Sequence, residues 1–330
     1  MTDLKDIQLL QKLGDMKSRF FDEIGKSVIG QHDVLNHVLI ALLCKGHTLI
    51  VGVPSLAKTL IIKSMSELLD LSFNRIQFTP DLMPSDITGT DIIEEDQGTA
   101  KRKFRFFKGP IFANVILADE INRTPPKTQS ALLEAMQESR VTTGGNTYTL
   151  DQPFFVLATQ NPIEQEGTYP LPEAQLDRFM FNILIDYPDK LEEIEIVKKL
   201  TSSNRESIEP VISKEELSAF QDLIQHVPVA DNVIEHAVHL VAMTRPSDKR
   251  APQITQDWLE WGAGPRASTF LVMAAQAKCL LSGKTTPDID DINHIAKPIL
   301  RHRIITNFTA EADGVSKEDI LDQLIATTKA

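Results

Sequence analysis

The chain has 330 residues, of which 42% are hydrophobic and 24% charged, a composition typical of a globular protein with room for two domains. Its formal net charge of −12 disfavours a surface that wraps nucleic acid. Cys44 and Cys279 have neither disulfide-framework nor zinc-ligand spacing, and the chain does not begin with an apolar stretch of signal-peptide length. The longest apolar run of the first half, 38–44, is too short to span a bilayer, so we expect a cytoplasmic protein without a membrane span.

The first part of the chain predicts a helix and then a small apolar box. Apolar residues recur with helical spacing through residues 1–27, which predicts an amphipathic lead-in helix. Val28-Ile29-Gly30-Gln31 then interrupts the pattern before a second helix at about 32–44. Because a phosphate-loop pattern follows, Ile29 and its neighbours could form the apolar slot for a purine base. An uncharged turn that packs on the core is the alternative.

The next stretch predicts a phosphate-binding loop. An apolar run at 47–51 precedes it and a helical pattern at 60–69 follows it, which is the strand, loop and helix order of a P-loop. The residues that would bind nucleotide are Gly52, Val53, Pro54, Ser55, Leu56, Ala57, Lys58 and Thr59. In such a loop the lysine reaches the β- and γ-phosphates and the threonine hydroxyl binds Mg²⁺. Ala57 stands where the pattern has Gly, and its methyl group crowds the phosphate. A surface loop that caps a helix is the alternative.

Residues 90–108 predict a basic β-hairpin after a core strand at 73–78. Two strand-like segments flank the turn formers Asp96-Gln97-Gly98. Lysines and arginines alternate there with phenylalanines in an otherwise acidic chain. A run of charge is most often a solvated face, but this one also fits contact with an acidic client or partner protein.

Residues 114–120 predict a buried parallel strand that ends in two acids. Four apolar residues run directly into Asp119 and Glu120, so both carboxylates would lie at the carboxyl edge of the sheet. Together with a P-loop, Asp119 would complete the Mg²⁺ shell and Glu120 would activate the attacking water. An acidic N-cap for the helix that follows is the alternative.

A third buried strand is predicted at 154–159, after a helix at 127–138 and a second hairpin at 140–150. Asn161 follows this strand. A polar amide beside the two acids could hydrogen-bond the γ-phosphate or its water, which makes Asn161 a candidate sensor. An Asn-Pro turn is the alternative.

Two arginines are further candidates. Arg178 ends a short helical stretch, where it could bind Asp177 or serve as an arginine finger in a neighbouring subunit's site, a role worth roughly 10³–10⁵ in rate. Strand patterns disappear after residue 187, and helical stretches predict a small all-helical domain. Arg266 lies in the first turn of one of these helices, where a cation opposes the helix dipole unless it meets phosphate.

Seven segments in this order resemble the AAA+ ATPases and, within them, the MoxR family, over nearly the whole chain. The segments are 28–31, 52–59, 78–86, 117–123, 158–162, 176–179 and 264–267. The resemblance implies an α/β fold, an αβα sandwich on a five-stranded parallel sheet, in residues 1–187, and a helical lid in residues 188–330. It also implies hairpin inserts near 90–108 and 140–150, and hexameric rings with ATP at the subunit boundaries. The departures from the family are Ser55, where Gly is common, and Ala57.

The predicted function is Mg²⁺-dependent ATP hydrolysis that drives chaperone-like remodelling or maturation of a protein partner. Proteins of this family are thought to act in metal insertion or complex maturation, often with von Willebrand A domain proteins. Catalysis is assigned to Glu120, Asn161, Arg178 and Arg266. A nucleotide-gated scaffold with little turnover is the main alternative, and a DNA translocase is disfavoured by the acidic charge balance.

Overall fold

The computed structural model describes residues 4–53, 58–95, 102–163, 167–201 and 207–328. Its centre is a sheet of five strands in the order β2-β5-β8-β1-β9, and every pair of neighbours is parallel. The strands are β1 (Thr48–Gly52), β2 (Phe73–Gln77), β5 (Val115–Asp119), β8 (Phe155–Gln160) and β9 (Phe181–Ile185). The predicted five-stranded parallel sheet is therefore confirmed.

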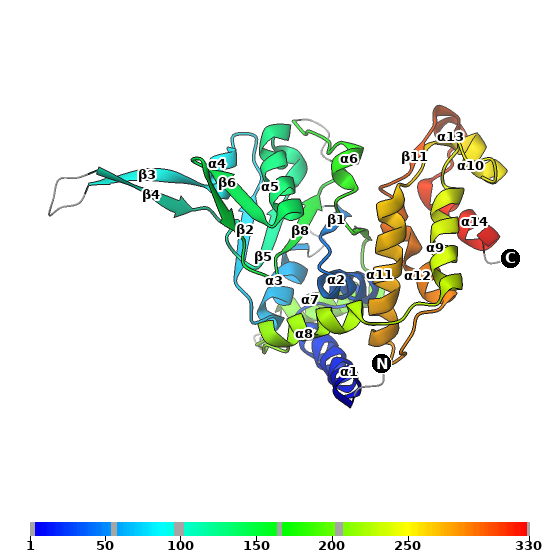
Figure 1. Ribbon diagram of the computed structural model, residues 1–330, viewed down its shortest axis with the longest axis horizontal. Coiled ribbons are helices and arrows are strands. Elements are labelled where there is room, and N and C mark those ends of the chain that lie inside the picture. Colours follow the sequence, from blue (N-terminus) through cyan, green and yellow to red (C-terminus); the bar gives the residue numbers. More distant parts are fainter. Residues whose placement is uncertain (1–3, 54–57, 96–101, 164–166, 202–206, 329–330) are drawn as a thin grey trace.

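Helices cover both faces of this sheet (Figure 1). Alternate residues of β5 point to opposite faces, so Leu117 belongs to one apolar cluster and Ile116 to another. The first cluster contains α1 (Leu4–Gly25), α2 (His32–Leu43) and α3 (Lys58–Leu68), and the second contains α5 (Pro126–Glu138). Because β5 is buried on both faces, its sequence is a continuous apolar run rather than an alternating one.

Two hairpins extend from the second face. Strands β3 (Gly89–Glu95) and β4 (Arg102–Lys108) form an arm that projects far from the body (Figure 1). The shorter pair is β6 (Arg140–Thr143) and β7 (Asn146–Thr149). Phe106 at the base of the arm stacks on Tyr148 of the shorter hairpin with ring centroids 4.1 Å apart. Phe104, farther along the arm, is 77% exposed. The turn of the arm, 96–101, lies outside the described residues.

The second half of the chain is mostly helical, as predicted. Helices α9, α11 and α12 stand side by side (Figure 1). The elements are α7 (Lys190–Thr201), α8 (Lys214–Gln225), α9 (Asp231–Met243), α10 (Gln253–Trp258), β10 (Leu259–Trp261), α11 (Pro265–Leu281), α12 (Ile289–Leu300), β11 (Ile305–Thr306), α13 (Phe308–Ala312) and α14 (Lys317–Thr328). The sequence did not predict the antiparallel pair β10–β11, because segments of two and three residues are too short to show alternation.

Helix α8 and the segment before it pack against both the core and the helices of the second half of the chain. Helix α8 contacts α1, α2 and α11, and Leu69 of the core pairs in parallel with Ile212 just before α8. Three short elements complete the fold: α4 (Pro84–Thr88), the 3₁₀ turn η1 (Ile121–Arg123) and α6 (Glu173–Leu176). Among the described residues, every helix is too short or too polar to cross a membrane.

Candidate nucleotide site

The predicted phosphate loop leaves the sheet at the end of its second-last strand, β1. Gly52 ends this strand, and a Cβ added there would lie 2.9 Å from the backbone oxygen of Ile185 on β9. Only glycine therefore allows β9 to approach so closely. Val53 is described, whereas Pro54, Ser55, Leu56 and Ala57 lie outside the described residues.

Lys58 begins α3 on the far side of the loop, and its side chain turns back to the sheet. The ammonium group donates to the backbone oxygen of Gly52 at the end of β1, and to that of Gln160 at the end of β8 with a distance of 3.4 Å. The cation is therefore held above the carboxyl ends of two neighbouring strands. Thr59, the next residue, is exposed in the first turn of α3.

Asp119 ends β5, on the other side of β8. Its side chain is only 9% exposed, and both carboxylate oxygens are hydrogen-bonded. Oδ1 accepts from the hydroxyl of Thr159 on β8 at 2.6 Å. Oδ2 accepts from the guanidinium of Arg75 on β2, at 2.6 Å from Nη2 and 3.2 Å from Nε. The buried acid is therefore oriented by both neighbouring strands.

Glu120 has an unusual backbone conformation. Its φ of 56° and ψ of 49° lie in the left-handed region, which costs a residue with a Cβ about 1–2 kcal/mol. The Thr159 hydroxyl accepts a hydrogen bond from the Glu120 N–H at 2.9 Å. The carboxylate accepts from the Gln77 amide at 2.9 Å and from the Arg123 guanidinium at 3.0 Å. Strain of this kind concentrates at functional sites, which supports a chemical role for Glu120.

Asn161 follows β8 and is almost fully buried. Its Oδ1 accepts from the backbone N–H of Ile163 at 3.2 Å, which is the predicted turn. Its Nδ2 is buried and finds no acceptor in the part of the chain that the structure describes. The turn and the sensor interpretations are therefore compatible: one end of the amide builds the turn, and the other keeps a donor for a ligand oxygen.

The Asp119 carboxylate and the Thr59 hydroxyl suit a Mg²⁺ ion that is bound mainly by the phosphates of a nucleotide. Within the described ranges there is no group of three or more His, Cys, Asp or Glu that could hold a metal ion by itself. Mg²⁺ commonly binds one or two carboxylates together with substrate phosphates. Asp119 supplies an oriented carboxylate, and Thr59 supplies an exposed hydroxyl in the first turn of the P-loop helix. These residues fit such a metal.

The two candidate arginines lie where the core meets the lid. Arg178 is half-buried just after α6. Arg266 is the second residue of α11, and its guanidinium binds Asp177 at 3.0 Å. Asp177 also binds Arg303 at 2.7 Å, so this carboxylate joins the core to two lid arginines. The ion pair offsets the unfavourable position of Arg266 at a helix N-terminus.

The predicted base slot lies beside the start of α7. Val28 is buried and Ile29 half-buried. Gly30 and Gln31 both have positive φ, and the Gln31 amide donates to the backbone oxygen of Asp186 at 3.3 Å. The segment is therefore a tight turn that packs on the core, which was the alternative to the base slot. The contact of Ile29 with a base stays a prediction.

Sequence reasoning gave no role to four residues around the two acids. Arg75 and Gln77 were missed altogether, whereas Arg123 and Thr159 belong to the segments 117–123 and 158–162 that carry the resemblance. The only sequence signal for the first two is that polar residues two positions apart point to one face of a strand. Arg75 and Gln77 contact the two acids only because β2 lies beside β5, with Gln77 paired with Asp119. The strand order is not visible in the sequence.

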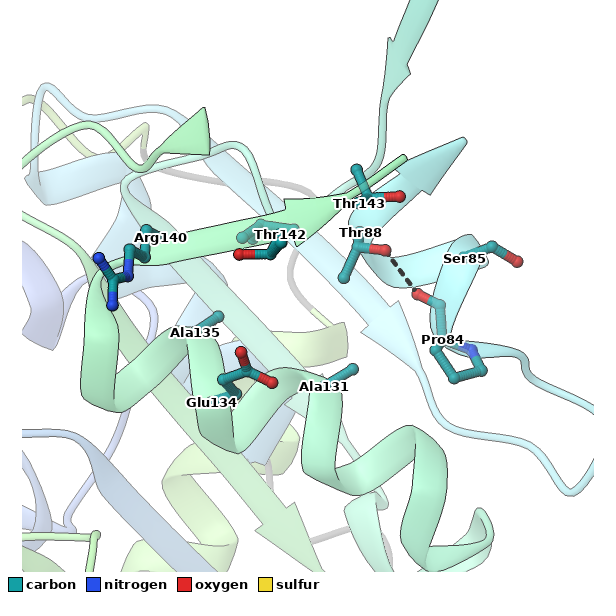
Figure 2. A pocket seen from close by; sticks show the side chains of 10 residues that line it. Pro84, Ser85, Thr88, Ala131, Glu134, Ala135, Arg140, Thr142 and Thr143 are labelled. Atoms are coloured by element: carbon teal, nitrogen blue, oxygen red, sulfur yellow. Dashed lines mark hydrogen bonds between the residues drawn. The ribbon is translucent and has the colours of Figure 1, made fainter. Parts of the chain in front are cut away.

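A separate hollow of about 240 Å³ lies between α4, α5 and β6 (Figure 2). Its polar lining includes Glu134, Arg140 and Ser85. The hydroxyl of Thr88, also in its wall, donates to the backbone oxygen of Pro84 at 3.0 Å. No residue of the predicted nucleotide site lines this hollow, so the two are distinct.

Comparison with known proteins agrees with this fold. The family model described as "ATPase family associated with various cellular activities (AAA)" matches residues 47–181, and the model of the AAA lid domain matches residues 251–324. A crystal structure of a candidate ATPase from Cytophaga hutchinsonii superposes with a TM-score of 0.89 at 42% identity, and the match covers 97% of this chain and 96% of that one.

Two relatives match over similar lengths. The YeaC protein of Bacillus subtilis is 41% identical over 97% of this chain and 96% of its own. Chaperone MoxR1 of Mycobacterium tuberculosis is 39% identical over 92% of this chain and 80% of its own. These matches confirm the predicted family, its fold class and its ATPase activity. The chain therefore belongs to the MoxR family of AAA+ ATPases.

Proposed function

We propose that this ATPase hydrolyses ATP in a Mg²⁺-dependent reaction and uses the energy to remodel or mature a protein partner. One observation carries the proposal: Lys58, Asp119 and Asn161 come from three neighbouring parallel strands or the segments that follow them. All three lie at the same carboxyl edge of the sheet. Ligands of open α/β sheets bind at this edge.

Each side chain has a role that follows from its position. Lys58 would leave its backbone oxygens to bind the β- and γ-phosphates, and Asn161 would give its buried N–H to the γ-phosphate or to the attacking water. Glu120 would take the proton of that water. The hydrogen bonds from Gln77 and Arg123 both go to its Oε2, so Oε1 is the oxygen that we assign to this step. Mg²⁺, when bound, neutralises charge on the phosphates beside Asp119 and Thr59.

The arginines extend the proposal to a ring. We assign Arg178 the role of a finger in the site of a neighbouring subunit of a homo-hexamer, and Arg266 that of a phosphate contact from the lid. Mixing Arg178→Ala with Lys58→Ala subunits then restores part of the activity, because some boundaries contain one intact site. Absence of recovery in mixed rings that demonstrably assemble would count against a finger acting between subunits.

The partner is proposed to be a protein. Chaperone MoxR1 is a relative named for that activity. The β3–β4 arm exposes Phe104 and Phe107 together with basic residues, a surface suited to an acidic protein. A von Willebrand A domain protein and a role in metal insertion are the finer expectations. A Glu120→Gln variant stalled with ATP should retain such a partner in pull-down experiments, and an arm variant, Phe104→Ser, should release it.

Turnover tests the hydrolysis directly. Glu120→Gln keeps the shape of the side chain but removes the base, so the rate of phosphate release should fall about 10²–10⁴-fold. Chelation of Mg²⁺ should abolish turnover in the unaltered protein. Glu134→Gln, an exposed acid on α5, is the matched control and should leave the rate unchanged. Equal and negligible rates in the unaltered protein and Glu120→Gln would contradict the proposal.

A nucleotide-gated scaffold is the second candidate. The observation that favours it is that Oε2 of Glu120 accepts hydrogen bonds from both Gln77 and Arg123, which lowers the basicity of this carboxylate. A scaffold binds ATP tightly and releases its partner without hydrolysis. Partner release that is unaffected by Glu120→Gln would therefore favour the scaffold over the motor.

A further inference from the structure

The order of the strands brings the Arg75 side chain into contact with Asp119. Strand β2 lies at the edge of the sheet beside β5, and their parallel register sets Gln77 against Asp119 and Arg75 against Leu117. Arg75 and Gln77 share one face of β2, so the arginine side chain runs along that face to the end of β5. Its Nη2 lies 2.6 Å from Asp119 Oδ2 and 2.8 Å from Gln77 Oε1.

The two partners differ in their access to solvent. The Arg75 side chain is 47% exposed, whereas that of Asp119 is 9% exposed. A buried carboxylate without a nearby cation is strongly unfavourable, so Asp119 needs a positive partner whenever no metal is near. Arg75 supplies it from the solvent side. About half of the arginine side chain is already hydrated, so the arginine itself moves into water at little cost once a metal balances Asp119.

Asp119 is also the carboxylate assigned to the metal shell. A divalent cation beside Asp119 and a guanidinium in contact with Oδ2 would be a few ångströms apart, and like charges at that distance repel. The remaining oxygen, Oδ1, is already bound by the Thr159 hydroxyl at 2.6 Å. The arginine and the metal therefore compete for the charge of one buried acid.

We propose that Arg75 is a built-in competitor of Mg²⁺ at Asp119: it neutralises the acid before the metal-nucleotide complex arrives and thereby raises the metal concentration that the site requires. Arg75 is thus a positioning residue that tunes metal affinity. The inference rests on the proposed function, since it takes Asp119 as part of the metal shell.

Metal binding without turnover tests it. Mn²⁺ serves as a paramagnetic probe, titrated into the full-length protein with one equivalent of ADP. Free Mn²⁺ is followed by electron paramagnetic resonance, and the same titration of ADP without protein gives the contribution of the nucleotide alone. Arg75→Gln should lower the apparent Kd for Mn²⁺ by about threefold or more, because a repelling charge is removed. Arg75→Lys keeps the positive charge, so its apparent Kd for Mn²⁺ should stay closer to that of the unaltered protein than the Kd of Arg75→Gln does.

Arg140→Gln is the matched control. It removes an arginine of similar exposure that binds Glu138, away from both acids, and should leave the Kd for Mn²⁺ unchanged. Arg75→Met, which keeps the aliphatic stem, repeats the test should Arg75→Gln fail to fold. An unchanged or higher Kd in the neutral variants would overturn the inference, because the arginine would then merely orient Asp119. A complete absence of Mn²⁺-ADP binding in the unaltered protein would instead contradict the proposed function itself.

Discussion

Two aspartates of this molecule bind arginines at almost the same distance but in different surroundings. Asp119, at the sheet edge, binds Arg75 at 2.6 Å. Asp177, where the core meets the lid, binds Arg303 at 2.7 Å. The side chain of Arg75 is 47% exposed and that of Arg303 is 1% exposed. The first pair can exchange its cation, whereas the second is built into the structure.

The hydrogen bonds of Arg303 explain this difference. Besides the Asp177 carboxylate, its guanidinium donates to the backbone oxygens of Asp177, Phe179, Met180 and Ile299. Burial lowers the pKa of Arg303 to about 10, against the opposing effect of Asp177. Because Ile299 belongs to α12 and the other three carbonyls to the core, one arginine fixes the lid against the sheet.

The largest effect should follow from removing that arginine. Arg303→Met removes the buried cation from Asp177, which keeps only its more exposed pair with Arg266, and removes a donor from four backbone oxygens. The free energy of unfolding should therefore fall by about 3–5 kcal/mol. Urea denaturation measures it. Arg75→Met is the matched variant at the sheet edge. In a buffer that contains Mg²⁺ and ADP, a loss as large as that of Arg303→Met would erase the distinction between the two pairs.

Arg266 separates function from stability at Asp177. Its ion pair is partly exposed, so Arg266→Gln should cost less than about 1 kcal/mol of stability. If the lid brings this arginine to a phosphate, turnover should nevertheless fall about 10- to 100-fold. The rate of phosphate release gives the turnover, and urea denaturation of the same preparation gives the free energy of unfolding. Unchanged turnover would leave Arg266 as a structural partner of Asp177.

Acid should weaken the lid junction. His302 donates to the backbone oxygen of Phe179 at 3.0 Å, and burial, followed by the charge of Arg303, lowers its pKa well below the usual value. Below the unfolded pKa of about 6.5 only the unfolded chain takes up this proton, so stability falls as the pH falls.

The matched variant is His302→Gln, which keeps a side-chain donor. Between about pH 7.5 and pH 5.5 it should lose roughly 1 kcal/mol less stability than the unaltered protein. Denaturation midpoints at the two pH values measure the difference. Equal losses in both proteins would mean that His302 does not contribute to the acid sensitivity.

The smallest effect is expected for Arg75. Its replacement by Gln should change the free energy of unfolding by less than about 1 kcal/mol in a buffer that contains Mg²⁺ and ADP, because the metal then balances Asp119. Without them the loss should be larger, since the buried acid has no cation. A loss that does not depend on metal and nucleotide would indicate a purely structural pair.

The sequence predicted those parts of the site that lie at the ends of apolar runs. Asp119 and Asn161 follow continuous buried strands, and parallel strands end at one edge, so their proximity could be inferred. Lys58 could be placed because loop and helix adjoin in the chain. The placement of Ile29 and of the two candidate arginines relative to a ligand remains a prediction.

The partners of the acids could not be predicted from sequence. Arg75 acts on Asp119 only because β2 pairs with β5, and Arg303 reaches Asp177 only because the lid folds back over the core. Both contacts arise from tertiary packing of segments far apart in the chain, which leaves no periodic or local signal. The β10–β11 pair was missed for a related reason, since its short strands owe their conformation to each other.

Binding of nucleotide is the most direct test of the account. Calorimetric titration of Mg²⁺-ATP into Glu120→Gln, which should bind without hydrolysing, is expected to give saturable heat that Lys58→Ala greatly reduces. This result would place the triphosphate at the carboxyl edge of the sheet. Absence of heat, or equal heat in the Lys58→Ala protein, would contradict the central claim that these strand ends form one nucleotide site.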